Sequence, residues 1–189
     1  MSCGGLTFRR PIPDDYERVM AVLPAWWDGR DLRAQIPWVF FEHFRSTSMV
    51  VEHEDALVGF LIGFLCPDHL DEAYVHLVGV APAWRRTGLG GDLYRRFFAL
   101  ARTAGRSVVR AATAPVNTTA IAFHIAQGFS LLPGDEGADA APVAAQRGPF
   151  GEPRVRFELR LQPPSGASPA EAPLADAPPA ETSPAEARS

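Results

Sequence analysis

Apolar residues along the chain follow two kinds of spacing. Short runs rich in β-branched and aromatic residues predict strands, and apolar residues that recur every three or four positions predict helices. The predicted strands cover residues 6–10, 48–52, 57–65, 73–80, 107–112 and 154–161, and another opens at Phe129. The predicted helices begin near Asp14, Pro37, Gly88 and Asn117. The chain therefore alternates strands with helices over most of its length.

Local signals set the ends of several elements. Asp14 followed by Glu17 has the spacing of a capping box, which starts a helix, and Pro24 predicts the end of that helix. A polar turn at residues 53–55 separates two apolar runs, so these runs are expected to form a hairpin.

The segment between residues 26 and 44 is rich in aromatic side chains. They are Trp26, Trp27, Trp38, Phe40, Phe41 and Phe44. Aromatic residues carry large apolar area, so they either form core or line a pocket for an acceptor, with Glu42 and His43 as its polar groups. The sequence does not choose between these alternatives for any single residue.

Residues 78–94 predict a strand, a tight glycine turn and the start of a helix. A helix N-terminus offers unpaired backbone N–H groups and the positive end of the helix dipole, and both attract anions. Gly88 and Gly90 lack a Cβ and let the backbone approach a ligand, while Arg85 and Arg86 add positive charge. The turn is expected to bind a phosphate or pyrophosphate; the alternative is an ordinary glycine-rich turn flanked by surface arginines.

The order of residues in this turn excludes two common phosphate sites. A P-loop ends in Gly-Lys-Ser/Thr, and a dinucleotide-binding turn has Gly-x-Gly-x-x-Gly with an acidic residue about twenty positions later. Residues 85–90 are Arg-Arg-Thr-Gly-Leu-Gly, which matches neither pattern. Their form, Arg/Gln-x-x-Gly-x-Gly/Ala, resembles the coenzyme A pyrophosphate loop of the GNAT acyltransferase superfamily.

Composition limits the classes of protein that fit. The chain has 189 residues, 47% of them hydrophobic, which suits one domain with a sizeable core. A net charge of −4 argues against general nucleic-acid binding, which depends on a basic surface. No apolar run has transmembrane length, the first residues lack a signal-peptide pattern, and Cys3 and Cys66 make no disulfide framework. We therefore expect a cytoplasmic protein with no membrane or nucleic-acid partner.

A second motif lies in the helix predicted from Asn117 to Gly128. Residues 117–129 are Asn-Thr-Thr-Ala-Ile-Ala-Phe-His-Ile-Ala-Gln-Gly-Phe. They are similar to the C-terminal GNAT signature, Asn-x-x-Ala/Ser-x-x-Phe/Leu-Tyr/His-x-x-x-Gly-Phe. One helix and one strand separate this motif from the glycine turn, as in that family. With two motifs in the right order, the chain is identified as a member of the GNAT superfamily.

The resemblance extends over residues 6–161, and we assign residues 1–161 to one GNAT N-acetyltransferase domain. It implies an α/β fold, with a mixed, twisted sheet flanked by helices. Residues 133–153 are rich in Gly, Ala and Pro and predict a loop longer than in the shortest family members. Residues 162–189 are rich in Pro, Ala, Ser and Glu and predict a disordered tail, because they cannot bury enough apolar surface to offset the entropy of ordering.

The resemblance also implies a coenzyme A site, with acetyl-CoA as the acyl donor and no metal ion. Backbone groups of Val78 and Val80 would hydrogen-bond the pantetheine arm. The pyrophosphate would be held by Arg85 and by the backbone amides of Arg86, Thr87, Gly88, Gly90 and Gly91. Asn117 would contact the cofactor near the pantetheine; it is also placed to cap its helix, and the two roles are compatible.

His124 stands where many family members have a tyrosine that protonates the departing thiolate. A histidine can do the same once it is protonated, because its ordinary pKa is about 6.5. The alternative is a histidine that satisfies a hydrogen bond in the core.

The attacking amine must be neutral, so a base or a water chain has to remove its proton. His76 resembles histidines that some amine acetyltransferases of the superfamily place on the corresponding strand. If its strand alternates regularly, it shares a face with Tyr74 and Val78. The alternative is a strand histidine packed against a helix. Weaker candidates for the base are Glu72, Glu42 and His43.

We expect direct attack of the amine on acetyl-CoA in a ternary complex, because nothing near Cys66 in the sequence indicates an activated thiolate. The backbone N–H of Val80 is a candidate to polarise the carbonyl. The acceptor is a small-molecule or peptide amine, and a homodimer is left open. Two other classes of function remain, a non-catalytic coenzyme A binding or sensor module and an interaction protein.

Overall fold

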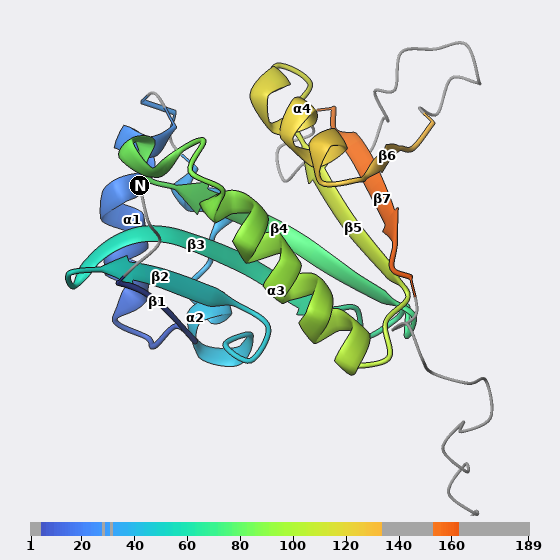
Figure 1. The fold of residues 1–189 in the computed structure, drawn as a ribbon, viewed down its shortest axis with the longest axis horizontal. Coiled ribbons are helices and arrows are strands. Elements are labelled where there is room, and N and C mark those ends of the chain that lie inside the picture. The colour runs from blue at the N-terminus through green and yellow to red at the C-terminus, as the bar shows by residue number, and fades with distance from the viewer. Residues whose placement is uncertain (1–4, 28, 31, 134–152, 163–189) are drawn as a thin grey trace, which may run out of the picture.

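The computed structural model describes residues 5–27, 29–30, 32–133 and 153–162. Its strands form one sheet in the order β1-β2-β3-β4-β5-β7-β6 (Figure 1). They are β1 Leu6–Arg9, β2 Met49–His53, β3 Ala56–Leu65, β4 Glu72–Val80, β5 Val108–Thr113, β6 Ser130–Leu131 and β7 Val155–Arg160. β4 and β5 are parallel, and every other neighbouring pair is antiparallel. The predicted mixed sheet and the hairpin of β2 and β3 are therefore confirmed.

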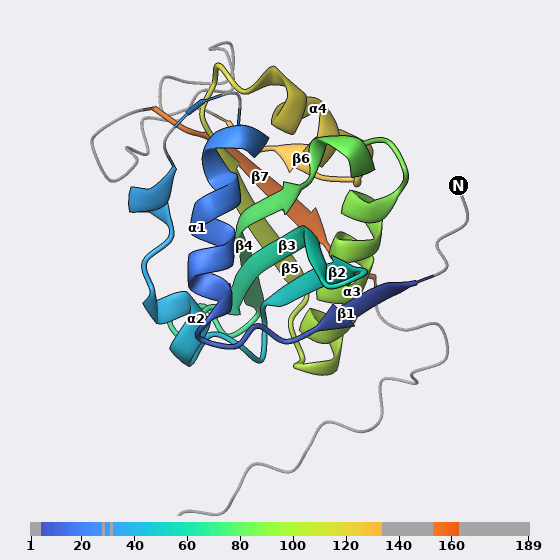
Figure 2. The same ribbon diagram turned by 90° about the vertical axis from the view of Figure 1, so that its left-hand side faces the viewer.

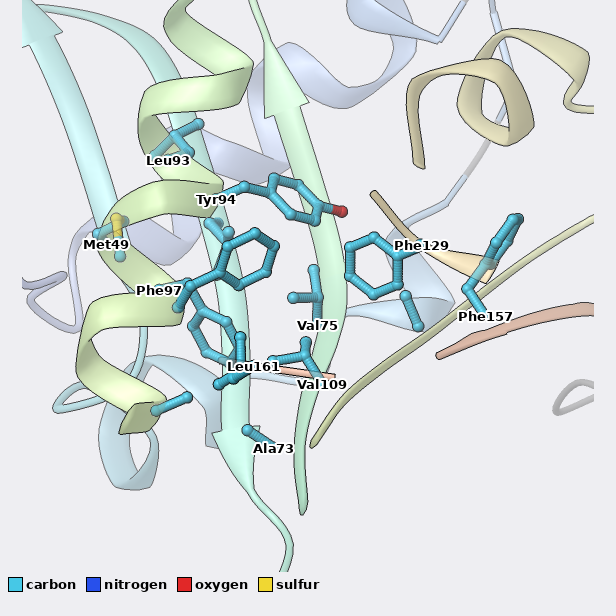
Figure 3. Close-up of a cluster of buried hydrophobic side chains, with 14 of the residues drawn as sticks. Met49, Ala73, Val75, Leu93, Tyr94, Phe97, Val109, Phe129, Phe157 and Leu161 are labelled. Atoms are coloured by element: carbon cyan, nitrogen blue, oxygen red, sulfur yellow. The ribbon is translucent and has the colours of Figure 1, made fainter. Parts of the chain in front are cut away.

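Helices cover both faces of the sheet. α1 (Asp15–Trp26) and α2 (Val39–His43) lie on one face, and α3 (Leu89–Thr103) and α4 (Thr118–Ala126) lie on the other (Figure 2). Each face has its own cluster of buried apolar side chains. Figure 3 shows the cluster under α3, in which Leu93, Tyr94 and Phe97 point toward the strands. Short 3-10 helices, η1 (Arg33–Gln35) and η2 (Pro82–Trp84), lie in the connections.

β4 and β5 pair over only part of their length. Residues 72–75 of β4 pair with residues 108–111 of β5, but β4 continues to Val80 and β5 to Thr113. Beyond the paired part, the side of β4 that faces β5 has no strand partner. The backbone of residues 77–80 is therefore open to a ligand on that side.

β4 contains a bulge at His76. Across the pair with β3, Ile62 faces Leu77 and Gly63 faces Val75. His76 is thus an extra residue with no partner of its own, and a bulge of this kind shifts the side chains that follow it to the opposite face.

The bulge corrects the face predicted for His76. The His76 ring stacks on Phe40 and the Tyr74 ring stacks on Phe64, while Phe40 and Phe64 stack on each other, so these four side chains share one face. Val78, by contrast, packs in the cluster on the α3 face. The expectation that His76 lies on the face of Tyr74 is right, and the expectation that Val78 does so is wrong.

The capping box predicted at Asp14 is also wrong. The side chain of Asp14 makes no cap hydrogen bond, and α1 begins at Asp15. The Asp15 carboxylate accepts a 2.8 Å hydrogen bond from the backbone N–H of Ile12 and pairs with Arg9 at 2.6 Å and Arg18 at 2.9 Å. Asp15 is fully buried, and these donors compensate its charge there.

Pro24 does not end α1, because the helix continues to Trp26. A proline removes one helical hydrogen bond, which costs least near a helix end. The carbonyls around it are satisfied: Leu23 accepts from Trp27 at 3.1 Å, and Pro24 accepts from Gly29 at 2.8 Å. The extra turn carries two tryptophans toward β4.

Two predicted features, the central part of the 133–153 loop and the tail from residue 163 onward, lie outside the described residues. In the part of the chain that the structure describes, no helix is both long enough and apolar enough to cross a membrane.

Candidate active site

The glycine turn leads from β4 through η2 into α3. Arg86 and Gly88 adopt positive φ angles of 63° and 97°. A φ of 97° is strained for any residue with a Cβ, which explains the glycine at this position. The Asp92 N–H donates to the Gly88 carbonyl at 3.0 Å and begins the helical pattern, so the N–H groups of residues 89–91 have no helical partner. The turn therefore has the open amides that an anion site needs.

A pocket of about 430 Å³ lies beside this turn. Its walls come from the end of α1, from β4, from the turn and from α4. It is lined by Trp26, Trp27, Arg30, Val78, Gly79, Val80, Trp84, Arg85, Arg86, Gly90, Asn117, Thr119, Ala120 and Phe123. The charged side chains among these are all arginines. The pocket is thus suited to a ligand with several negative charges.

Most of the predicted cofactor residues reach this pocket. Val78, Val80, Arg85, Arg86, Gly90 and Asn117 line it. Thr87, Gly88 and Gly91 lie beside it in the turn, and none of them is in its wall. The Thr87 hydroxyl donates to the Trp84 carbonyl at 2.7 Å, and a Cβ on Gly91 would face Arg95 and Gln127. The contacts of their backbone amides with the pyrophosphate stay a prediction.

Arg85 extends across the pocket. One of its terminal nitrogens donates to the Trp26 carbonyl at the end of α1. Its Nε donates to the Val80 carbonyl at 3.4 Å. Arg85 therefore connects α1 to β4 and occupies one of the backbone groups predicted to bind pantetheine.

Trp27 lies over the open end of β4. A Cβ on Gly79 would stand 2.7 Å from the Trp27 indole and 2.5 Å from the Phe60 ring, so only glycine fits beneath them. Trp26 and Trp27 both line the pocket, whereas Phe41 is fully buried core. The aromatic segment thus contributes both to the core and to the wall of a pocket.

A smaller cavity of about 80 Å³ opens where β4 and β5 separate. Trp27, Val78, Asn117 and Ala120 line both this cavity and the larger pocket, so the two adjoin. His76, Tyr94 and His124 line the smaller cavity. The structure therefore brings together the two histidines that the sequence proposed, from β4 and from α4.

Asn117 caps α4, as expected. Its Oδ1 accepts a 3.2 Å hydrogen bond from the backbone N–H of Ala120. Asn117 also lines both cavities, so a contact with a ligand is compatible with the cap.

His124 is buried and makes two hydrogen bonds. Its Nδ1 donates to the Ala120 carbonyl at 2.7 Å, since a carbonyl only accepts. In a neutral ring Nε2 is then an acceptor, and the hydroxyl of Tyr94 donates to it at 3.0 Å. Burial lowers the pKa of His124 and raises the pKa of the Tyr94 hydroxyl, which favours the neutral form of both groups. The ring also stacks on Phe157, with 4.5 Å between centroids.

His76 is fixed by one hydrogen bond and one ring contact. Its Nε2 donates to the Gln35 carbonyl at 2.5 Å, and the ring stacks on Phe40 with 4.6 Å between centroids. Burial lowers the pKa of His76, so the ring is neutral at pH 7. Nδ1 therefore carries the free lone pair and is the atom able to accept a proton.

The four remaining candidates, three for the base and Cys66 for a nucleophile, lie elsewhere. Glu72 pairs with Arg110 at 2.7 Å. Neither Glu42 nor His43 lines the two cavities. Burial raises the pKa of the Cys66 thiol, which disfavours a reactive thiolate. Within the described residues, no group of three or more His, Cys, Asp or Glu side chains is placed to hold a metal ion.

Sequence reasoning missed Tyr94 and Arg30. Tyr94 falls on the apolar face of α3 and looks like ordinary core, and Arg30 follows the aromatic segment without a motif around it. A polar hydroxyl at a core position, which needs a buried partner, is the signal that could have drawn attention to Tyr94.

The model of the Acetyltransferase (GNAT) family matches residues 13–129. The chain belongs to this family. Solved structures share the fold: Ard1 from Thermoplasma volcanium has a TM-score of 0.65 at 23% identity and covers 84% of this chain and 99% of its own. Diaminobutyrate acetyltransferase EctA from Paenibacillus lautus, solved with L-2,4-diaminobutyric acid and coenzyme A, has a TM-score of 0.60 at 19% identity and covers 82% of this chain and 95% of its own.

Curated relatives match a shorter part of this GNAT chain. The L-2,4-diaminobutyric acid acetyltransferase of Virgibacillus pantothenticus is 32% identical over 91 residues, which are 48% of this chain and 57% of the relative. The enzyme of that name from Halalkalibacterium halodurans is 28% identical over 109 residues, which are 50% of this chain and 58% of the relative. The chain thus spans somewhat over half the length of these relatives.

Proposed function

We propose that this chain is an N-acetyltransferase that moves an acetyl group from acetyl-CoA to a small-molecule amine. The observation that carries the proposal is the continuity of the two cavities. An arginine-lined pocket at the start of α3 adjoins, along the open edge of β4, a cavity lined by two histidines. Membership of the family supports the reaction type. Relatives named for diaminobutyric acid support an amine acceptor of low molecular weight.

The residues of the pocket fit coenzyme A. Arg85 and Arg86 offer positive charge to a pyrophosphate, beside the free amides of the α3 N-terminus. A Cβ on Gly90 would stand 3.0 Å from the Phe123 ring, so glycine keeps the path between α3 and α4 open. When bound, acetyl-CoA supplies an activated thioester; the chain holds and orients it.

The backbone of Val80 is oriented to take part. The Ala81 N–H donates to the Val58 carbonyl of β3 at 2.9 Å. Backbone groups of successive strand residues point in opposite directions, so the N–H and carbonyl of Val80 point to the open side of β4. The Val80 N–H is therefore suited to polarise the acetyl carbonyl, and holding amine and thioester in line supplies much of the rate enhancement.

His76 is the proposed base. Its Nε2 proton is held by Gln35, so Nδ1 is free to accept a proton from the amine, directly or through a water molecule. The amine nitrogen then forms the bond to the acetyl carbon as the bond from carbon to sulfur breaks. The products are the N-acetyl amide and coenzyme A.

The departing sulfur requires a proton, and the pair of His124 and Tyr94 is the proposed source. His124 as observed is an acceptor at Nε2, so it gives a proton only after gaining one. A tyrosine hydroxyl both donates and accepts. Tyr94 is thus able to pass a proton from a protonated His124 to the sulfur while remaining neutral itself.

The test is acetyl-CoA-dependent thiol release over a panel of small amines, amino acids, aminoglycosides and peptides, with product detection by mass. The proposal predicts a product with a small amine or amino acid. Binding of acetyl-CoA by calorimetry is measured in parallel. Acetyl-CoA binding without any acetylated product would favour the coenzyme A sensor instead, and the absence of acetyl-CoA binding would contradict both.

A further inference from the structure

Arg154 lies next to the smaller cavity although it belongs to neither predicted motif. β7 begins at Val155, which pairs with Thr113 at the end of β5. Thr113 lines the cavity where β4 and β5 separate. Arg154 directly precedes β7, so it lies at the end of the sheet where β4 and β5 separate.

Arg154 points to the side of the sheet on which His76 lies. Val155 and Phe157 are buried in the cluster under α3, so the residues that alternate with them face the other way. Arg154 is half-buried, and its positive charge acts on both the Tyr74 hydroxyl and the His76 ring, where it helps to disfavour a protonated imidazole. The register of β7 thus places Arg154 at the edge of the smaller cavity and on the face of His76, although its side chain lines neither cavity.

Arg154 has no carboxylate partner among the described residues, whereas several other arginines on strands and helices do. Arg9 and Arg18 share Asp15 and Glu52. On the face of β4, β5 and β7 nearest to Arg154, the two candidate carboxylates are already engaged: Glu72 and Glu158 both pair with Arg110. A half-buried guanidinium that has no counter-ion among the described residues can bind an incoming carboxylate through two parallel hydrogen bonds.

None of the described residues that line the two cavities is acidic. Their charged lining residues are Arg30, Arg85 and Arg86, and the smaller cavity adds only two neutral histidines. An acceptor with several positive charges, such as an aminoglycoside or a polyamine, would find no counter-charge among these described lining residues. An amine that carries its own carboxylate would find one in Arg154.

We propose that the acceptor is an amino acid and that Arg154 binds its carboxylate while its amine lies at Nδ1 of His76. This assignment rests on the acetyltransferase function proposed above. It makes Arg154 the residue that distinguishes an amino acid from the corresponding amine without a carboxylate.

The test compares matched acceptors that differ only in the carboxylate. The pairs are L-2,4-diaminobutyrate with 1,3-diaminopropane, L-ornithine with putrescine, and L-lysine with cadaverine. The wild-type protein is expected to prefer the amino acid in at least one pair. Arg154→Gln is expected to raise KM for that amino acid roughly 10- to 100-fold, the range of a charge-assisted hydrogen-bond pair, and to leave KM for its diamine within about twofold. Arg154→Lys should recover part of the loss, because it restores the charge without the bidentate geometry.

Two control variants distinguish a specific contact from a general effect. Arg160→Gln removes an arginine from the same face of β7 at its far end, where it pairs with Glu158, and should change neither KM. Arg30→Gln removes the other arginine not assigned to the pyrophosphate. A wild-type preference for the diamines, an equal rise of both KM values in Arg154→Gln, or a selective effect of Arg30→Gln alone would each overturn the proposal.

Calorimetry separates this proposal from the proposed function. The amino acids are titrated into protein saturated with coenzyme A, which gives a binding constant without any turnover. Loss of this binding in Arg154→Gln, with coenzyme A affinity unchanged, supports the carboxylate site even if no acetyl transfer is seen. Amino acid binding that is equal in wild type and Arg154→Gln overturns it even if transfer occurs.

Discussion

The hydroxyl of Tyr94 on α3 and Nε2 of His124 on α4 are joined by a 3.0 Å hydrogen bond within the cavity that also holds His76. The Ala120 carbonyl fixes the other nitrogen of His124, so the ring has one defined tautomer. This pair connects the helix that follows the glycine turn to the helix that carries the second motif. The proton transfer proposed for His124 would therefore involve Tyr94 as well.

Replacing either member of this pair should impair turnover more than cofactor binding. We expect His124→Ala and Tyr94→Phe each to lower kcat at least about tenfold, because both interrupt the same proton path, while acetyl-CoA affinity stays within about twofold. Steady-state kinetics measures kcat, and calorimetry measures the affinity for acetyl-CoA. Phe129→Leu is the matched control, because the Phe129 ring contacts the rings of Tyr94 and His124 but has no group that can transfer a proton. A normal kcat in Tyr94→Phe would exclude the relay, and a normal kcat in His124→Ala would leave His124 as a packing residue.

His76 should set the acidic limb of the pH profile. Burial lowers its pKa below the ordinary value, so the ring is neutral and able to accept a proton down to a pH below about 6.5. As the pH falls through the lowered pKa, His76 becomes protonated and kcat/KM for the acceptor should fall. His76→Ala should lower kcat/KM at neutral pH and flatten this limb. The pH profile of His124→Ala is measured in parallel, because burial lowers the pKa of His124 too. If the acidic limb of the profile is unchanged in His76→Ala, a water chain and not His76 removes the proton.

A carboxylate at the start of α3 should prevent cofactor binding. Gly88→Asp would place negative charge beside the predicted pyrophosphate site, and no atom lies within 4 Å of the added Cβ. Gly105→Asp is a close control, because Gly105 also has a positive φ, of 74°, and equally open surroundings at the other end of α3. We expect Gly88→Asp alone to weaken acetyl-CoA binding in calorimetry by more than tenfold. Equal affinities for the two variants would disprove the assigned site.

Gly79 and Gly63 offer a second matched comparison. A Cβ on Gly79 would collide with the Trp27 and Phe60 rings, and a Cβ on Gly63 would stand 2.5 Å from Phe97 on the other face. Both alanine variants should unfold at lower temperature, with a loss of about 1–3 kcal/mol for overpacking. Only Gly79→Ala should also raise KM for the acceptor, because Trp27 lines the pockets. Equal kinetic effects would mean that Trp27 is not part of the acceptor site.

The two motifs and the α/β order were predictable from the sequence. A glycine at position 88 is needed for a local φ angle, and Asn117 caps a helix through the N–H three residues later. Such signals depend on residues that are neighbours in the chain, so a sequence states them directly. Local signals also gave the two errors at α1: the Ile12 N–H and the Arg9 side chain bond to Asp15 instead of Asp14, and the helix runs past Pro24 to the buried Trp26.

The chemistry of the site was decided by contacts between residues distant in the chain. The bulge at His76 arises from the register between β3 and β4 and turns Val78 to the opposite face. The bond from Tyr94 to His124 and the approach of Arg154 to His76 depend on how helices and strands from different parts of the chain pack. The family and the glycine turn follow from the sequence. Which nitrogen of His76 keeps a free lone pair, and which nitrogen of His124 accepts from Tyr94, depends on the tertiary structure, because register and packing are properties of the whole sheet.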